Sequence, residues 1–248
     1  MANKGLVLVT GANGYVAART VEAFLQAGYA VRGTVRSASS GKSVTDALPE
    51  YADRLEMVLV PDITLPGAFD EAVKGEFLGR NSTTRHRKEI ADPAVPVPGV
   101  DAVAHLAAPV SMHFTDPAPV LKGAIDGILR ALESAHKEPT VKSFIFMSSI
   151  AAVLHHLERP EDIVFDESDW NSEAEDLLAQ LGKDAPGPVI YSASKTAAEK
   201  ALWKFRDEQH PAFSVTAIQP VYVFHPPPPR CLVACLDPQH PKSSFISE

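Results

Sequence analysis

The chain has 248 residues and a formal net charge of −8, with 45% hydrophobic and 22% charged residues. These fractions match folded globular proteins and exclude a wholly disordered chain, and the acidic excess argues against a general nucleic-acid-binding protein, which carries a basic surface. The apolar runs are too short for a membrane span or a signal peptide, and two cysteines are too few for a disulfide framework, so a cytoplasmic protein is expected.

Strand-like and helix-like segments alternate along most of the chain. Short apolar runs predict strands at residues 6–10, 30–35, 55–60, 100–106, 141–147 and 213–218. Helical periodicity predicts helices at residues 15–26, 67–74, 120–136 and 191–209, with a further helix-like stretch at 173–181. Strands that alternate with helices form parallel βαβ units, so we expect an α/β fold with a doubly wound parallel sheet.

Two segments interrupt this alternation. Residues 76–98 stand where a connection of about 2–6 residues is usual, and they include a basic run at residues 80–88. We interpret this segment as an atypical surface insertion, with a loop that binds phosphate or nucleic acid as the alternative. Residues 225–248 carry a proline run without any helical or strand pattern. We therefore expect one domain over residues 1–224, followed by an irregular tail.

A glycine-containing turn lies between the first predicted strand and the first predicted helix. Small residues there let the backbone approach a pyrophosphate, and the start of the helix presents N–H groups and the positive end of its dipole. Because a strand precedes the turn and a helix follows it, the context favours a dinucleotide site over a tight turn without a ligand. The candidate cofactor-binding residues of this turn are Gly11, Ala12, Asn13, Gly14, Tyr15 and Val16.

The next two strand ends are candidates for the adenosine part of such a cofactor. Arg36 follows the second strand, where an arginine accommodates the 2′-phosphate of NADP and an acidic residue would favour NAD. We therefore expect NADP(H), with a solvated loop cation as the alternative role of Arg36. Asp62 and Ile63 follow the third strand and are placed to hold the adenine ring, whereas a turn-forming role of Asp62 after Pro61 is the alternative.

A second group of residues has the chemistry of proton transfer. Tyr191 and Lys195 are four residues apart in a predicted helix, so they share a helical face. An ammonium beside a phenol favours the ionised phenol, which suits this pair for proton transfer near neutral pH. Ser148 and Ser149 end the fifth strand, at the edge where ligands bind in parallel sheets, and a serine hydroxyl there can hold a carbonyl oxygen.

Together these motifs resemble the extended short-chain dehydrogenase/reductases, a group within the NAD-dependent epimerase/dehydratase superfamily. Within that group, the chain is similar to NADPH-dependent methylglyoxal and aldehyde reductases and to dihydroflavonol reductases. The resemblance covers residues 1–75 and 99–224. The matching motifs are Val9–Ala17, Val60–Ile63, His105–Pro109, Ser148–Val153, Tyr191–Lys195 and Gln219–Phe224.

The resemblance implies a Rossmann sheet and a mechanism in which NADPH delivers a hydride to a small aldehyde or ketone. It implies that Tyr191 donates the proton, that Lys195 acidifies the phenol and holds the nicotinamide ribose, and that Ser149 polarises the carbonyl group. It also implies that Ala107 passes under the cofactor and that Pro220-Val221 flanks the nicotinamide. The hydride chemistry belongs to the cofactor, while the protein supplies position and electrostatics.

The chain departs from this family after Phe224, where relatives continue into a C-terminal part that builds most of the substrate-binding lobe. We therefore expect most of that lobe to be absent. One alternative function is a non-catalytic NADP-binding protein or an inactive truncated form. A second alternative is a nucleotide-sugar epimerase or dehydratase, which shares the serine, tyrosine and lysine but more often uses NAD, so Arg36 weighs against it. No metal site is expected, because no ligand set with sensible spacing is evident.

Overall fold

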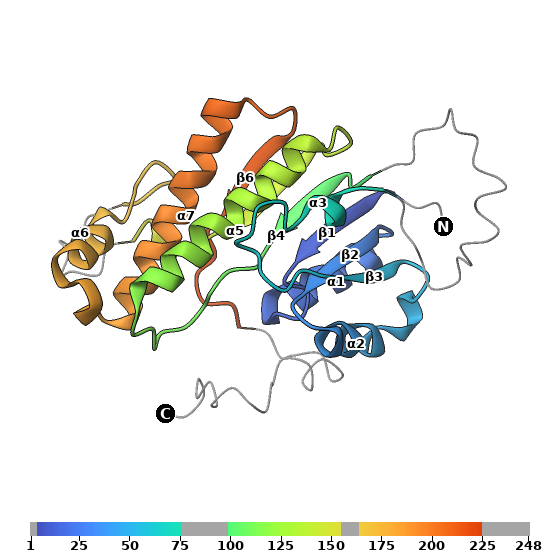
Figure 1. The fold of residues 1–248 in the computed structure, drawn as a ribbon, viewed down its shortest axis with the longest axis horizontal. Coiled ribbons are helices and arrows are strands. Elements are labelled where there is room, and N and C mark those ends of the chain that lie inside the picture. The colour runs from blue at the N-terminus through green and yellow to red at the C-terminus, as the bar shows by residue number, and fades with distance from the viewer. Residues whose placement is uncertain (1–3, 76–98, 155–163, 225–248) are drawn as a thin grey trace.

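A parallel β-sheet with helices on both faces forms the centre of the molecule (Figure 1). The computed structural model describes residues 4–75, 99–154 and 164–224. Its strands are β1 (Leu6–Thr10), β2 (Ala30–Val35), β3 (Leu55–Leu59), β4 (Ala102–His105), β5 (Ser143–Met147) and β6 (Ser214–Ile218). They form a sheet in the order β3-β2-β1-β4-β5-β6, and all neighbouring strands are parallel. The expected doubly wound α/β sheet is thus confirmed.

The predicted helices are present; α1 has the predicted ends, and the ends of most others are shifted. The helices are α1 (Tyr15–Gln26), α2 (Ala38–Ala47), α3 (Asp70–Val73), α5 (Pro117–Lys137), α6 (Ser172–Leu181) and α7 (Gly187–Gln209). Both α5 and α7 begin earlier than predicted, because each has a proline in its first turn, where a missing N–H costs nothing. Tyr191 consequently lies in the second turn of α7 rather than at its start.

Helix α2 is absent from the sequence-based prediction. Its residues are mainly Ala, Ser, Gly and Lys, so hydrophobic periodicity is weak. The helix begins after Ser37, whose Oγ accepts a hydrogen bond from the backbone N–H of Ser40 at 3.3 Å. Val44 and Ala47 provide buried contacts along its length. The cap brings the start of α2 next to the end of β2 and therefore next to Arg36.

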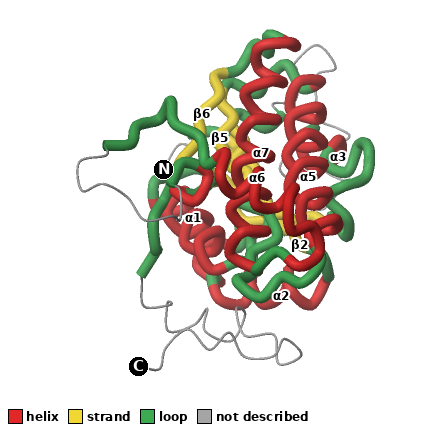
Figure 2. The backbone as a smooth tube through the Cα atoms, turned by 90° about the vertical axis from the view of Figure 1, so that its left-hand side faces the viewer, coloured by secondary structure: helices red, strands yellow, loops and turns green. Residues whose placement is uncertain are grey.

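Two apolar layers hold the helices against the sheet. Successive side chains of a strand point to opposite faces, and β1 shows this directly. Leu6 and Leu8 belong to the core beneath α3, α5 and α7, whereas Val7 and Val9 belong to the core beneath α1 and α2. Helices α5 and α7 run side by side on their face of the sheet, as both views show (Figures 1 and 2).

Arg32 is a buried cation inside β2, only 4% exposed. Its Nε donates to the Glu56 carboxylate of β3, and its Nη1 donates to the carbonyl oxygens of Ala72 at 2.9 Å and Lys74 at 2.6 Å. One guanidinium therefore fastens α3 to the β2–β3 side of the sheet.

We expect Arg32→Met to lower the free energy of unfolding by about 3 kcal/mol, because it removes one partner of a buried ion pair. Lys142→Met is the matched control, since the Lys142 side chain is 77% exposed and pairs with Asp101 at the surface. An exposed pair of this kind contributes ~0–1 kcal/mol. Urea denaturation measures both losses, and equal losses would contradict this role of Arg32.

Candidate active site

The candidate residues lie where parallel strands end. Gly11 follows β1, Arg36 follows β2, Ala107 lies just beyond β4, Ser149 just beyond β5, and Pro220 just beyond β6. All carboxyl ends of parallel strands meet at one edge of the sheet. From β1, the chain adds β2 and β3 on one side of the sheet, and from β4 it adds β5 and β6 on the other side. The strand order therefore reverses between β1 and β4, and ligands bind at such a reversal. The structure therefore brings these candidates to the edge where a binding crevice is expected.

The glycine turn leaves room for a ligand to reach the backbone. Gly11 has a φ of +65°, and a Cβ added to it would lie 3.2 Å from the Cα of Ala107. Gly14 is the N-cap residue of α1 and provides no side-chain cap. The backbone at the start of α1 is thus accessible to an anion, which the helix dipole attracts. This turn fits the pyrophosphate of a dinucleotide.

A hydroxyl group fixes this turn to the neighbouring strand end. Thr10 Oγ1 accepts hydrogen bonds from the backbone N–H groups of Leu106 and Ala107, both at 3.0 Å, and lies 3.1 Å from His105 Nδ1. Since the two acceptor positions of Thr10 are used, its proton is donated to Nδ1. Burial, with a smaller effect of the Lys195 charge, lowers the pKa of His105 to about 3. His105 is therefore neutral and serves as an acceptor.

The strand ends expected to hold the adenosine part are more exposed. Arg36 is exposed and is followed by a cluster of serine hydroxyls, with Ser37 Oγ 3.0 Å from Ser39 Oγ and 2.9 Å from Ser40 Oγ. A guanidinium beside hydroxyl donors is chemically suited to a phosphate group.

Asp62 has a structural role as well as its predicted binding role. Its Oδ1 accepts hydrogen bonds from Thr64 N at 2.8 Å and Thr64 Oγ1 at 2.7 Å. These hydrogen bonds hold the pKa of the Asp62 carboxyl below its usual value. The turn-forming alternative is therefore present in the structure, and adenine binding by Asp62 and the half-buried Ile63 remains a prediction.

Lys195 is buried beside Tyr191. It is 4% exposed, and its Nζ donates to the carbonyl oxygen of Met147, the last residue of β5, at 3.1 Å. The same Nζ lies 6.0 Å from the centre of the Tyr191 ring. Burial lowers the pKa of Lys195 to about 8, and the charge of Glu199 opposes that shift. The helix thus places a cation that titrates close to neutral pH next to a half-buried phenol.

The two serines after β5 have different partners. Ser148 is buried, and its Oγ donates to the carboxylate of Glu199. Ser149 caps a short 3₁₀ turn, and its Oγ accepts from Ala151 N at 3.2 Å, a bond that does not use the hydroxyl proton. The Ser149 hydroxyl proton is therefore available for a carbonyl oxygen, whereas the Ser148 hydroxyl proton is already donated to Glu199.

The segment after β6 lies against the same turn. The backbone N–H of Ile150 donates to the Pro220 carbonyl oxygen at 3.0 Å, and Ser148 N donates to the Ile218 carbonyl oxygen at 2.9 Å. These bonds place Pro220-Val221 next to the turn that carries Ser149, and Val221 is 67% exposed.

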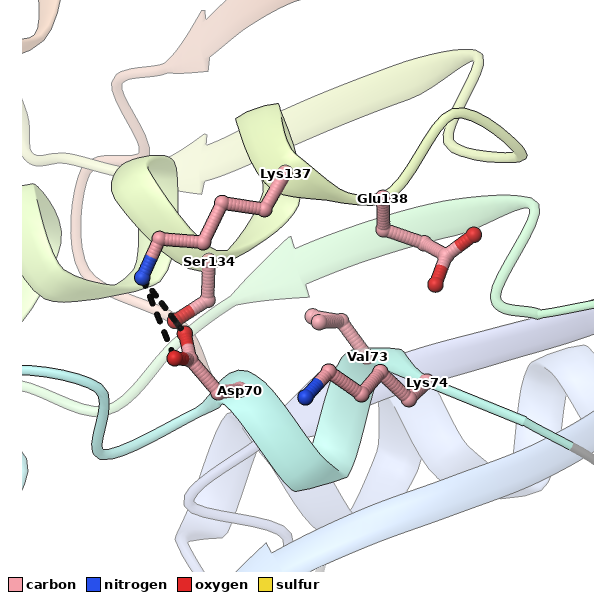
Figure 3. A pocket seen from close by; sticks show the side chains of 6 residues that line it. All are labelled: Asp70, Val73, Lys74, Ser134, Lys137 and Glu138. Carbon is pink, nitrogen blue, oxygen red and sulfur yellow. Dashed lines mark hydrogen bonds and ion pairs between the residues drawn. The ribbon is translucent and has the colours of Figure 1, made fainter.

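A small pocket lies elsewhere, where α3 meets the end of α5 (Figure 3). Asp70 Oδ1 accepts from Ser134 Oγ at 2.7 Å, and Asp70 Oδ2 lies 3.0 Å from Lys137 Nζ. The Ser134 hydrogen bond, followed by Lys137, lowers the pKa of Asp70. The cavity measures about 20 Å³, which is room for about one water molecule. We interpret the Asp70 hydrogen bonds as a structural contact that holds α3 against α5.

Several sequence-based interpretations fall outside the described residues, namely those of the segments 76–98 and 225–248. Over the described ranges, no helix has the length and apolar character needed to cross a bilayer. Within the same ranges, no group of three His, Cys, Asp or Glu side chains has the arrangement of a metal site.

Comparison with known proteins identifies relatives that have reductase names. The chain is 39% identical over 222 residues to aldehyde reductase 2 of Sporidiobolus salmonicolor, covering 88% of this chain and 57% of that protein. It is 31% identical over 211 residues to dihydroflavonol 4-reductase of Arabidopsis thaliana, covering 84% of this chain and 47% of that one.

A solved structure shows the same fold. The yeast methylglyoxal/isovaleraldehyde reductase Gre2 complexed with NADPH aligns with a TM-score of 0.72 and 30% sequence identity, covering 90% of this chain and 59% of that chain. This chain therefore spans less than two thirds of the length of these relatives. The sequence model of one family, described as the NAD dependent epimerase/dehydratase family, matches residues 7–229. With the glycine turn, the parallel sheet and the strand-end residues all in place, that match shows that the chain belongs to the NAD-dependent epimerase/dehydratase family.

Proposed function

We propose that the chain is an NADP(H)-dependent oxidoreductase that reduces the carbonyl group of a small aldehyde or ketone. The observation that carries the proposal is the buried Lys195 ammonium beside the Tyr191 phenol, at the same sheet edge as the glycine turn. A protein that only binds a dinucleotide has no need of such a proton donor. The names of the aldehyde reductase and methylglyoxal reductase relatives support the same reaction class.

The residues at the strand ends fit a nicotinamide dinucleotide phosphate. When bound, that cofactor supplies the hydride. The glycine turn holds its pyrophosphate, Arg36 its 2′-phosphate, and Asp62 with Ile63 its adenine ring. Ala107 would pass under it, and Pro220-Val221 would flank its nicotinamide. We propose residues 1–224 as the cofactor-binding domain.

The remaining chemistry belongs to side chains of this chain. The Ser149 hydroxyl donates a hydrogen bond to the substrate carbonyl oxygen and polarises it. The Tyr191 phenol donates its proton to that oxygen as the alkoxide develops. The Lys195 ammonium stabilises the phenolate that remains, because opposite charges in a buried site attract strongly.

The full chain is expected to oxidise NADPH in the presence of methylglyoxal or another small aldehyde. The measurement is the loss of NADPH absorbance, compared with the same mixture without aldehyde. Saturable NADPH binding without any oxidation would instead favour the second candidate function, a non-catalytic NADP-binding protein.

Arg36→Ala is expected to weaken NADPH binding by about 10- to 100-fold, because one or two charge-assisted hydrogen bonds to the phosphate are lost. NADH binding should change little, since NADH has no 2′-phosphate. Lys204→Ala removes an exposed cation from α7 and serves as the control. Fluorescence titration measures the affinities, and wild-type protein that binds NADH more tightly than NADPH would overturn the cofactor assignment.

A further inference from the structure

We propose that Glu199 is a positioning residue of this site, which holds the ends of β5 and β6 against α7 and places a negative charge one helical turn from Lys195. The inference deepens the proposed function and rests on it for the role of Lys195 in turnover. Its charge effect on Lys195 can nevertheless be measured without turnover.

The Glu199 carboxylate is buried, and both of its oxygens accept hydrogen bonds. The residue is 2% exposed and lies on α7. One oxygen, Oε2, accepts from Ser148 Oγ, and the other, Oε1, accepts from Gln219 Nε2 at 2.8 Å and Trp203 Nε1 at 3.3 Å. A buried carboxylate is tolerated only where such donors compensate for its lost hydration.

These donors come from the segments that carry the proposed active-site groups. Ser148 directly precedes Ser149 after β5, and Gln219 directly precedes Pro220-Val221 after β6. Trp203 lies one turn further along α7, the helix that also presents Tyr191 and Lys195. One carboxylate therefore links the proton donor, the carbonyl-polarising serine and the nicotinamide-flanking segment. A shift in any of them would change the distances on which hydride and proton transfer depend.

Glu199 is also the anion that acts on Lys195. The two are four residues apart on α7 and share a face. β5 presents the Phe146 ring, 5.6 Å from Lys195 Nζ, and the Met147 carbonyl oxygen. β4 presents His105, which is neutral because burial lowers its pKa to about 3. On α7 itself, Tyr191 is the other titratable neighbour.

Burial and Glu199 shift the pKa of Lys195 in opposite directions. Burial lowers it and the Glu199 charge raises it, with a result of about 8. Without the carboxylate charge, only the effect of burial remains, so the ammonium loses its proton at a lower pH. The charged lysine is the form that stabilises the phenolate, and activity is therefore expected to fall as pH rises through the pKa of Lys195.

Two substitutions separate the charge of Glu199 from its position. In Glu199→Gln, the amide oxygen can accept from Trp203 and Gln219, and the amide nitrogen can donate to Ser148 Oγ. This variant keeps the contacts and removes the charge. Glu199→Ala removes both. Glu175→Gln is the matched control, because Glu175 pairs with Lys200 at the surface between α6 and α7.

The deciding measurement is a carbon-13 NMR titration of the lysine ε-methylene groups in the full chain, with Lys195 assigned from the Lys195→Arg spectrum. In Glu199→Gln, the midpoint of Lys195 should fall by roughly one pH unit relative to wild type. In Glu175→Gln it should stay at the wild-type value. An unchanged midpoint in Glu199→Gln, in a protein with the wild-type melting temperature, would overturn the inference.

Turnover provides the second measurement. In Glu199→Gln, the alkaline loss of kcat should move to lower pH by the same interval, whereas Glu199→Ala should lower kcat at every pH. If Glu199 had a merely structural role, Glu199→Gln would lower the melting temperature but would not change the pH at which kcat falls. If wild type binds NADPH but reduces no carbonyl compound, the proposed function fails, and the NMR titration alone still decides whether Glu199 controls Lys195.

Discussion

Replacement of Tyr191 by phenylalanine is expected to lower NADPH-dependent carbonyl reduction by at least about 100-fold. The substitution removes only the phenol oxygen, which is the proposed proton donor, and keeps the ring that lies beside Lys195. NADPH affinity should change by only a few-fold, because the glycine turn and Arg36 are untouched. Single-turnover measurement of NADPH oxidation tests the chemical step directly.

The control for this variant is Tyr29→Phe, which removes the same atom from another part of the molecule. The Tyr29 ring packs edge-on against Phe24, at the amino end of β2. Its loss should leave the rate of carbonyl reduction unchanged. Equal rates for wild type and Tyr191→Phe would exclude Tyr191 as the proton donor.

Gly11→Ala is expected to weaken NADPH binding by at least about tenfold. The new Cβ would lie 3.2 Å from the Cα and 3.3 Å from the Cβ of Ala107, so the glycine turn and the end of β4 must move apart. The proposed pyrophosphate site lies between these two segments. Calorimetric titration with NADPH measures the loss.

Gly75→Ala is a control matched in backbone strain. Gly75 has a φ of +66°, close to the +65° of Gly11, but a Cβ at Gly75 meets nothing within 4 Å. Gly75→Ala should lose about 1–2 kcal/mol of stability, because an L side chain is disfavoured at positive φ. Gly11→Ala should lose at least as much, because its Cβ also contacts Ala107. Only Gly11→Ala should also lose NADPH affinity. Equal affinities in the two variants would place the cofactor away from this turn.

The strands and the sheet could be predicted because their signal is local. A strand buried on both faces, such as Leu6–Thr10, is a continuous apolar run. The alternation of such runs with helices implies a parallel sheet. Helix α2 lacks a comparable signal, because its stability depends on a serine cap and on the buried Val44 and Ala47 rather than on a strong apolar stripe.

The same distinction applies to the site. Tyr191 and Lys195 are found from their spacing on one helix, and the glycine turn from its place between a strand and a helix. Glu199 was not singled out by these patterns, because its partners Ser148 and Gln219 come from separate strand ends and meet only in the folded protein. Its position one turn after Lys195 is the only local signal that the sequence offers.

The most direct test of the central claim is whether the protein binds NADPH at this edge of the sheet. We expect calorimetric titration of the folded full chain to show saturable binding of one NADPH per chain, with weaker binding of NADH. A folded chain that shows no saturable binding of either cofactor would contradict the proposed site and the function that depends on it.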